Sequence, residues 1–300
     1  MHALSALIIR NIKLFFKDKG MFFTSLITPV ILLVLYATFL GGVYRDSFAA
    51  AMPEGFSVPE KLTGGMVGGQ LFSSLLAVCC VTVAFCSNML MVQDKVTGAR
   101  SDLIISPVKG SVLAMSYYIA TALTTLIVCL TAAFACFLYL IGTGWYLSVS
   151  DVLLILLDVF LLVMFGTALS SVINFFLSSQ GQISAVGTVV SAGYGFICGA
   201  YMPISQFGAG LRRAIAFLPG TYGTSLLRNH ALRGVFAEME AENFPVQAIE
   251  EIKDSVDCNL YFFGGKVELH TMYLILFCAV AALVAAYVLM NLQMFRRTAK

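Results

Sequence analysis

The sequence predicts an all-α integral membrane protein with six transmembrane helices. Of its 300 residues, 59% are hydrophobic and only 11% are charged, whereas roughly a quarter of the residues in a soluble domain are charged. Several apolar runs exceed the roughly 20 residues that a helix needs to cross a bilayer. We therefore expect a single membrane domain over residues 1–300, with polar segments between its helices.

Residues 1–20 predict an amphipathic helix that lies on the membrane surface. Leu7 and Ile8 fall on one face of this helix, and Arg10 and Lys13 fall on the other. A helix of this kind binds an anionic lipid surface. No convincing small-residue cleavage site follows the first apolar run, so we expect that run to be retained as a span.

Six apolar segments follow in the chain, separated by polar residues or glycines. Pro29 is expected to kink the first of them, because proline cannot complete the helical hydrogen-bond ladder. The segments are residues 22–40, 66–91, 112–141, 152–177, 183–201 and 272–294.

The distribution of basic residues predicts the orientation of the chain. Six spans place both termini on one side, and basic residues outnumber aspartates there, while acidic residues predominate on the other side. Basic loops stay in the cytosol, so we expect both termini to be cytosolic. The basic residues on that side are Arg10, Lys13, Lys17, Lys19, Lys95, Arg100, Lys109, Arg296, Arg297 and Lys300.

Residues 92–111 have the pattern of a short helix between two spans. Gly98 can end the preceding helix, and Ser101 with Asp102 can begin a new turn. Aliphatic side chains beside water favour a partner that covers them. The segment is therefore either a docking element or a basic inner loop whose aliphatic residues dip into the headgroups. The aliphatic residues are Leu103, Ile104 and Ile105, which Ser106 and Pro107 terminate.

Residues 202–270 are too polar to cross the membrane and too apolar to form a free loop. Pro203 and Pro219 bracket a predicted short helix with Leu211, Ile215 and Leu218 on one face and Arg212 and Arg213 on the other. One interpretation is a lipid-surface helix that seals the outer end of the bundle.

The later part of this region, residues 235–266, is acidic and predicted to lie outside. A helical repeat of apolar residues predicts one amphipathic helix there. It is either a cap held on the outer mouth through Phe262 and Phe263, or a surface that handles a cationic substrate. The repeat consists of Val246, Ile249, Ile252 and Val256.

Small or polar residues recur at helical spacing in two spans. Such stripes either let helices pack closely within one bundle or line a pathway. Asp158 is a carboxylate inside the fourth span, where charge is costly, so it is either a functional group or a partner of a structural hydroxyl or water. The stripes are Gln70, Ser73, Ser74, Ala77, Cys80, Ala84 and Ser87 in the second span, and Gly187, Ser191, Gly195 and Gly199 in the fifth.

Motifs for nucleotide, metal or nucleophilic chemistry are missing from the sequence. No G-x-x-x-x-G-K-[ST], H-E-x-x-H, G-x-S-x-G or C-x-x-C pattern occurs, and His2, His230 and His270 are too scattered to suggest a site. Cys258 alone among the cysteines lies in a polar loop. We expect no catalysis by this chain alone, no metal or cofactor in it, and no nucleic-acid partner.

Two separated motifs resemble those of the type-2 ABC transporter permeases. The inner loop has the register G-x-x-x-x-L-x-x-S-P-V, with Ser101 where the family usually has an acidic residue. A later region has P-x-S, L-R-x-x-I, L-P-x-x-Y and an arginine, with Phe207-Gly208 where the family has a further proline. The first motif comprises Gly98, Leu103, Ser106, Pro107 and Val108, and the second Pro203, Ser205, Leu211, Arg212, Ile215, Leu218, Pro219, Tyr222 and Arg228.

The resemblance implies the membrane-spanning subunit of an exporter in the bacterial cell membrane. It implies that the inner loop, including Ile104, sits on a separate ATPase subunit that holds ATP and Mg. Residues 202–270 would form a re-entrant outer hairpin, and the second and fifth helices would line a cavity shared with a second copy or a similar permease. The expected cargo is drug-like, peptide or lipid-linked, moved by alternating access. An ATP-independent secondary transporter or a membrane sensor is the alternative.

Overall fold

The computed structural model describes residues 2–50, 59–106 and 108–298, and it is 85% helical. A single antiparallel pair of two-residue strands interrupts the helices within these residues. The elements are α1 (His2–Lys17), α2 (Lys19–Leu35), a π-helical turn (Tyr36–Leu40), α3 (Gly41–Ala50), α4 (Glu60–Val96), α5 (Ala99–Ile105), α6 (Gly110–Thr143), α7 (Val149–Phe176), α8 (Gln180–Ile197), a 3-10 turn (Ile204–Gln206), α9 (Ala209–Ile215), α10 (Pro219–Ala241), α11 (Val246–Ser255), β1 (Tyr261–Phe262), β2 (Gly265–Lys266) and α12 (Leu269–Thr298).

Five helical stretches are long and apolar enough to cross a membrane. The predicted fifth span, residues 183–201, is not among them: α8 ends at Ile197, and its glutamines, serines and glycines make it less apolar. Gly199 then turns the chain with a φ of 71°. The six-span count therefore stays a prediction. The five stretches are Lys19–Asp46, Glu60–Val96, Gly110–Thr143, Val149–Phe176 and Leu269–Met294.

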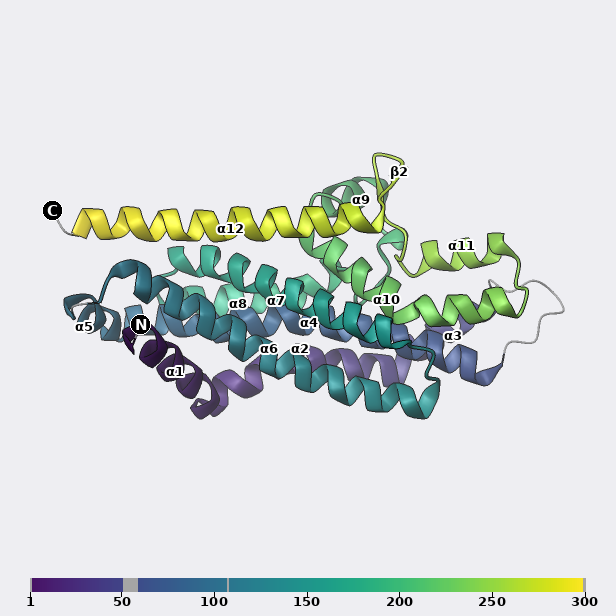
Figure 1. The fold of residues 1–300 in the computed structure, drawn as a ribbon, viewed down its shortest axis with the longest axis horizontal. Helices are drawn as coiled ribbons and strands as arrows, with labels where there is room; N and C mark the ends of the chain where they lie inside the picture. Colours follow the sequence, from purple (N-terminus) through teal and green to yellow (C-terminus); the bar gives the residue numbers. More distant parts are fainter. Residues whose placement is uncertain (1, 51–58, 107, 299–300) are drawn as a thin grey trace.

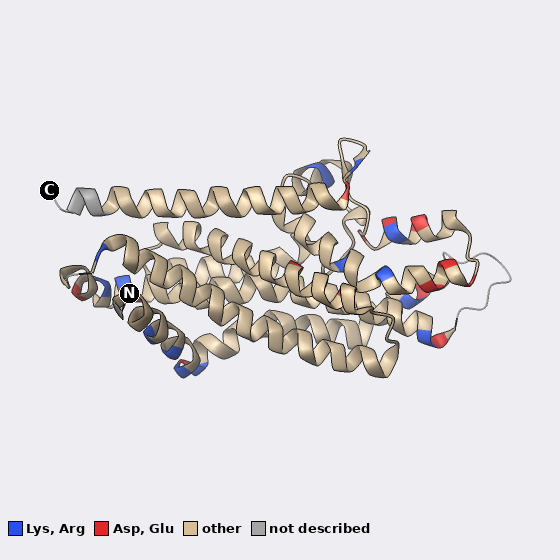
Figure 2. Ribbon diagram, viewed as in Figure 1, with Lys and Arg blue, Asp and Glu red and all other residues tan. Residues whose placement is uncertain are grey.

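The two termini lie at the same end of an elongated bundle, as the topology requires (Figure 1). We call this the inner end, and the opposite end, which carries α3 and α11, the outer end. Charged residues gather at both ends and are sparse along the bundle between them (Figure 2). This distribution is typical of a bundle with a hydrocarbon layer around its middle. Which end faces the cytosol stays a prediction.

The first spanning helix begins at Asp18, whose carboxylate accepts a hydrogen bond of 3.1 Å from the backbone N–H of Met21. Pro29 lies inside α2, but the irregular part of this helix is the π-helical turn at Tyr36–Leu40 beyond it. Because α2, this turn and α3 follow one another without a break, the first span continues well past its predicted end at residue 40.

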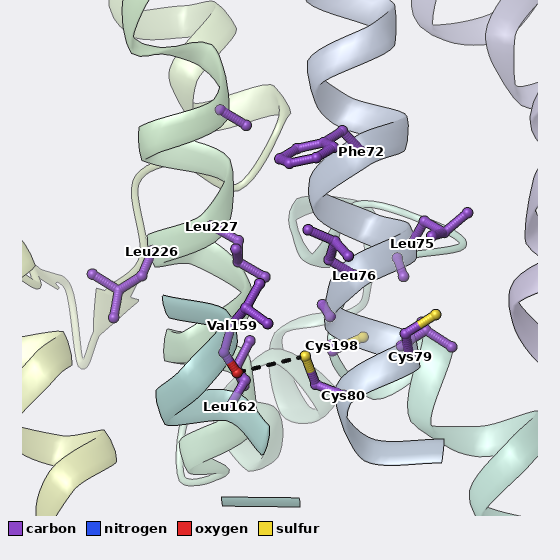
Figure 3. Close-up of a cluster of buried hydrophobic side chains, with 14 of the residues drawn as sticks. Phe72, Leu75, Leu76, Cys79, Cys80, Val159, Leu162, Cys198, Leu226 and Leu227 are labelled. Carbon is purple, nitrogen blue, oxygen red and sulfur yellow. Dashed lines mark hydrogen bonds between the residues drawn. The ribbon is translucent and has the colours of Figure 1, made fainter. Parts of the chain in front are cut away.

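Helix α4 is the centre of the fold and contacts α2, α6, α7, α8 and α10. Leu76 and Cys80 of α4 face Leu162 of α7 and Leu227 of α10 in a buried apolar cluster (Figure 3). A Cβ placed on Gly166 of α7 would lie 2.6 Å from the Cys80 carbonyl oxygen, so the two backbones touch there. Part of the small-residue stripe on α4 therefore serves close packing within the chain.

The short helix predicted between Pro203 and Pro219 is present as α9. Of its predicted apolar face, Ile215 is buried, Leu211 is 52% exposed, and Leu218 lies beyond the end of the helix. The helix is so short that one buried residue anchors it. Its other residues project away from the protein.

The predicted amphipathic helix in the acidic region is confirmed as α11. Ile249 and Ile252 are buried in a cluster with residues of α10, while Val246 is exposed. The prediction that Phe262 and Phe263 hold this helix on the outer mouth is wrong. Both rings contact the ring of Phe217, which follows α9.

Candidate functional site

A cavity of about 1260 Å³ runs along α4 between α2 and α8. Asp18 and Gln180 lie at its inner end, and Tyr201 and Ile252 line it toward the outer end. We call this space the α2–α8 cavity. Its length along the bundle makes it the feature of the described residues best placed to carry a molecule between the two ends.

The lining of the α2–α8 cavity is mixed polar and apolar. Asp18 is the only charged side chain among the described lining residues, and no Lys or Arg is among them. Isoleucines and methionines alternate with hydroxyl and amide groups. This surface suits an amphipathic molecule that is neutral or cationic, because an anion would find no opposite charge there. The polar lining includes Thr24, Thr28, Gln70, Gln93, Ser184, Thr188, Ser191 and Gln206.

The predicted pathway residues fall into two groups. Gln70, Gly187 and Ser191 line the α2–α8 cavity, but Gly195 does not, nor do the serines of the α4 stripe. The pathway role of these residues stays a prediction. The serines, all buried, are Ser73, Ser74 and Ser87.

Gln70 presents a hydrogen-bonding group to the cavity. Its amide Nε2 donates to the hydroxyl of Tyr44 at 3.4 Å, and its Oε1 is buried without a partner in the part of the chain that the structure describes. Tyr44 stacks on Tyr36, with ring centroids 5.6 Å apart. A buried carbonyl without a donor is costly, but this oxygen is covered by the protein, so a bound molecule reaches it only if the lining moves.

Gly195 of α8 packs against Tyr201, which follows the same helix, rather than against another helix. A Cβ at this position would collide with the ring of Tyr201, which lines the cavity. We expect Gly195→Leu to destabilise the protein by about 1–3 kcal/mol, because the ring has to move. Gly193→Leu is the matched control, since a Cβ there meets nothing within 4 Å. Equal thermal unfolding midpoints for the two purified variants would contradict this packing.

Arg228 holds the outer part of the bundle together from a fully buried position. Its Nη1 lies 3.1 Å from Oδ2 of Asp257, and its Nη2 donates to the Gly199 carbonyl and, at 3.4 Å, to Ser74. Asp257 also accepts a hydrogen bond of 2.8 Å from the backbone N–H of Ile204. One ion pair thus joins α4, α10, the turn after α8 and the segment after α11.

The second family motif predicts that Arg228 lies in the outer hairpin, but it does not predict which acidic residue pairs with it. An arginine without a charged neighbour in its own helix needs an acidic partner elsewhere if it is buried, because an unpaired buried charge is strongly destabilising. The acidic region offers many carboxylates, so the sequence does not single out Asp257. Pro203 and Tyr222, from the same motif, are buried nearby, and the Tyr222 hydroxyl donates to the Ala216 carbonyl at 2.6 Å. Pro219 begins α10, where its missing N–H costs nothing.

Asp158 has two hydrogen-bond partners, His230 and Tyr273, and neither was among the predicted site residues. Its Oδ2 lies 2.6 Å from His230 Nδ1, and the Tyr273 hydroxyl donates to its Oδ1 at 2.6 Å. The three side chains join α7, α10 and α12. None of them lines the α2–α8 cavity. Helical spacing does not indicate that His230 pairs with Asp158, because the two residues lie 72 positions apart in the chain.

An ion pair at the inner end connects α1 to the spans. The Arg10 guanidinium donates to both Asp94 oxygens at 2.8 and 3.0 Å, and the Tyr117 hydroxyl donates to the same carboxylate at 2.5 Å. Hydrogen bonding to Asp94 raises the pKa of Arg10 above its ordinary value. The amphipathic helix is therefore fastened to α4 and α6 by a bidentate pair, in addition to any contact with lipid.

Next to this pair, Lys95 caps the inner end of α7. Its ammonium donates to the carbonyls of Asn174, Phe175 and Leu177 at 3.3, 2.6 and 3.1 Å. A cation at the C-terminus of a helix is favoured by the helix dipole. Adjacent residues of α4 thus connect the inner ends of α1, α6 and α7.

Helix α5 lies at the inner end, in the predicted inner loop (Figure 1). Gly98 precedes it with a φ of 84°, so the helix begins at Ala99 and not at the predicted Ser101. The prediction of a fully exposed apolar knob is wrong for Leu103 and Ile104, which are half-buried against residues of α6, but Ile105 is 84% exposed.

The C-terminal side of α5 is set by Ser106. Its hydroxyl donates to the Leu103 carbonyl at 2.6 Å, and its backbone N–H donates to the Asp102 carbonyl at 3.2 Å. The predicted contribution of Pro107 lies outside the described residues. The exposed part of the predicted docking element is therefore reduced to Ile105 and its polar neighbours.

The acidic outer rim is partly neutralised by its own lysines. Glu250 is paired with Lys253 at 3.0 Å and with Lys266 at 3.1 Å. Hydrogen bonds from these two lysines lower the pKa of Glu250 to about 2. Cys258 beside this region is buried, which makes it a poor target for a labelling reagent added from outside. Among the described residues no cluster of His, Cys, Asp or Glu could hold a metal ion.

The family model described as ABC-2 type transporter matches residues 2–231. The match covers α1 through most of α10 and so includes the α2–α8 cavity, α5 and Arg228. A comparison with curated proteins finds no match.

Proposed function

The chain belongs to the ABC-2 type transporter family and is the permease of an ABC transporter, and we propose that it forms the pathway of an ATP-driven exporter in the bacterial cell membrane. As a permease component, the chain is not itself an enzyme. The family implies association with ABC ATPase subunits. In our proposal those subunits bind ATP and Mg at the inner end, and both termini lie in the cytosol.

The α2–α8 cavity is the observation that carries this proposal. It is open along a face on which α2 and α8 leave apolar side chains exposed, such as Ile27 at 53% and Phe196 at 51%. A second copy of the chain, or a similar permease, would cover this face and complete the pathway. The exported molecule would pass between the two copies as the complex alternates between inward and outward access.

The lining chemistry narrows the cargo. Among drug-like, peptide and lipid-linked candidates, we favour neutral or cationic amphipathic molecules, because only Asp18 brings charge to the described lining. A lipid-linked phosphate would have to enter without a basic residue to receive it.

The coupling proposal rests on α5 and the inner ion pair. In it, the ATPase subunit contacts Ile105, and its movement reaches the spans through the half-buried Leu103 and Ile104 and through the Arg10–Asp94–Tyr117 cluster. A ligand shifts such an equilibrium only if it contacts the two states differently. Contacts of α5 that change as the ATPase subunits close would meet this condition.

We expect Ile105→Asp to weaken binding of the ATPase subunit about tenfold, because losing an aliphatic side chain from an interface costs roughly 1–2 kcal/mol. Ile105 is a cleaner target than Leu103 or Ile104, since it is 84% exposed and its substitution leaves the fold intact. Val246→Asp, at 73% exposure on α11, is the control at the other end of the bundle. Unchanged co-purification of the ATPase subunit with Ile105→Asp would refute α5 as the docking element.

A second candidate function is ATP-independent secondary transport, favoured by one observation. Asp158, His230 and Tyr273 form a buried polar cluster of the kind that carries protons in such transporters. Because the cluster lies away from the cavity lining, we treat it as structural. Uptake into vesicles driven by a pH gradient without ATP, and lost in Asp158→Asn, would support this alternative over the exporter.

A further inference from the structure

A second cavity, of about 840 Å³, lies on the opposite side of α2 from the α2–α8 cavity. No described residue lines both spaces: Thr24 and Thr28 of α2 line the first, whereas Leu26 and Leu33 of the same helix line the second. Helices α2 and α6 both pack on α4 and hardly on each other, so α4 forms the floor between two walls. We call this space the α2–α6 groove.

Small side chains keep the α2–α6 groove open. A Cβ placed on Gly42 would meet nothing within 4 Å, and Ala132 and Ala135 are among the residues of the opposite wall on α6. Protein interiors rarely leave a space of this size, and the atoms around an empty one lose their van der Waals contacts. A flexible apolar chain that enters the groove restores these contacts, which drive association between apolar groups inside a membrane.

The one charged side chain along the described lining of the groove belongs to Arg45 of α3. Arg45 is exposed and takes part in no ion pair within residues 2–50, 59–106 and 108–298. Asp46 follows it directly, but consecutive residues of a helix do not face each other. The groove therefore combines an apolar body with one available cation.

Arg45 stands at the outer rim of the groove. It lies one helical turn beyond Gly41, whose Cβ would lie 3.9 Å from Val67 near the outer end of α4. Tyr139 of α6 comes to the same rim, since its ring lies 3.6 Å from the Cβ position of Gly68, and it is 48% exposed. The rim thus offers a guanidinium and a phenol hydroxyl, which are suitable donors to a lipid phosphate.

The length of the groove fits one leaflet better than a whole bilayer. Its floor runs from Val67 to Cys79 of α4 and its α6 wall from Ile127 to Tyr139, while the lining on α2 continues inward to Phe22. The floor and the α6 wall each rise by about 18 Å, compared with about 30 Å for the full hydrocarbon core. A spanning helix of a partner protein would need contacts along the whole core, whereas a lipid chain needs only one leaflet.

We propose that the α2–α6 groove binds a glycerophospholipid of the leaflet at the outer end, with one acyl chain along α4 and the phosphate on Arg45 and Tyr139. A guanidinium holds two phosphate oxygens at once, which makes arginine well suited to this contact. The bound lipid packs on the face of α2 opposite the α2–α8 cavity and supports one wall of that cavity. The site does not depend on the exported cargo, because no described residue lines both spaces.

Native mass spectrometry of the full chain, purified in detergent and freed of lipid, counts the lipids that it binds. The probes are phosphatidylglycerol and a diacylglycerol with the same acyl chains, which lacks the phosphate. We expect one phosphatidylglycerol per chain to bind about tenfold more tightly than the diacylglycerol, because only the former brings an anion to Arg45. Equal affinities for the two probes would overturn the proposal.

Two variants separate the headgroup contact from the acyl-chain contact. Arg45→Gln should reduce the affinity for phosphatidylglycerol to that for the diacylglycerol, whereas Ala135→Phe should weaken binding of both probes by filling the groove. Two matched changes outside the groove are the controls. Lys61→Gln removes an exposed cation at the outer end, and Ala282→Phe enlarges an exposed residue of α12. Neither control should alter the binding of either probe.

Each variant is judged against its control, after equal thermal unfolding midpoints have shown that both alanine variants are folded. Equal binding in Ala135→Phe and Ala282→Phe would show that no lipid chain enters the groove. Equal loss of phosphatidylglycerol in Arg45→Gln and Lys61→Gln would assign the effect to overall charge and contradict the role of Arg45. A dimer mass that is lost in Ala135→Phe would overturn the lipid assignment, because a second copy of the chain would then cover the groove.

Discussion

Arg228→Met should lower the free energy of unfolding by about 3–5 kcal/mol, because it leaves a buried carboxylate without its counter-charge. Arg228 is 1% and Asp257 3% exposed in this pair. The turn after α8 would also lose the guanidinium that binds the Gly199 carbonyl. Urea unfolding of the purified protein in detergent measures the change.

The same helix supplies the control for this prediction. Arg233 of α10 pairs with Asp151 at 2.9 Å, but its side chain is 55% exposed. Asp151 is 3% exposed, but it keeps hydrogen bonds from the Ser148 hydroxyl and backbone N–H at 2.6 and 3.0 Å, so Arg233→Met should cost less, about 1–2 kcal/mol. Arg228→Lys should fall between the two, since a lysine keeps the charge but cannot reproduce the forked contacts. Similar costs for Arg228→Met and Arg233→Met would show that the buried pair does not hold the outer hairpin.

Thr188→Trp should reduce export to about the level measured in vesicles that lack the ATPase subunit, and it should leave the fold intact. Thr188 lies on α8, is exposed and lines the α2–α8 cavity. An indole at this position projects into the pathway, and it displaces no packed side chain. Transport into vesicles that contain the permease and its ATPase subunit measures the effect, and ATPase co-purification checks assembly.

Val189→Trp is the neighbouring substitution that should be tolerated. Val189 is 70% exposed on the same helix but is not part of the cavity lining. The two variants add the same side chain to adjacent positions, so only the cavity distinguishes them. Normal export by Thr188→Trp, or equal loss in both variants, would mean that the cargo does not pass through this cavity.

The elements whose sequence pattern is local were predicted well. The amphipathic repeats predicted α1 and α11 close to the positions at which they are observed. The long apolar runs correspond to the five candidate spans. The left-handed conformation of Gly98 follows from the freedom of glycine to adopt positive φ. In each case neighbouring residues contain the whole signal.

The site was predicted less completely because its contacts join distant residues. Asp158 and His230 lie in separate helices, and Arg228 finds Asp257 among many possible carboxylates. Leu103 and Ile104 were expected to be exposed, and they are half-buried because α6 returns beside α5. Of the α4 stripe, Gln70 faces the cavity and the serines face the interior, a difference that helical spacing alone does not settle.

The most direct test of the exporter proposal is ATP-dependent accumulation of two amphipathic dyes of similar size, one cationic and one anionic. The vesicles contain the permease and its ATPase subunit, with the ATPase facing outward and ATP outside. We expect the cationic dye to accumulate only when ATP is present and not in Thr188→Trp, and we expect little accumulation of the anionic dye. Accumulation that continues without ATP, or that prefers the anionic dye, would contradict the proposal.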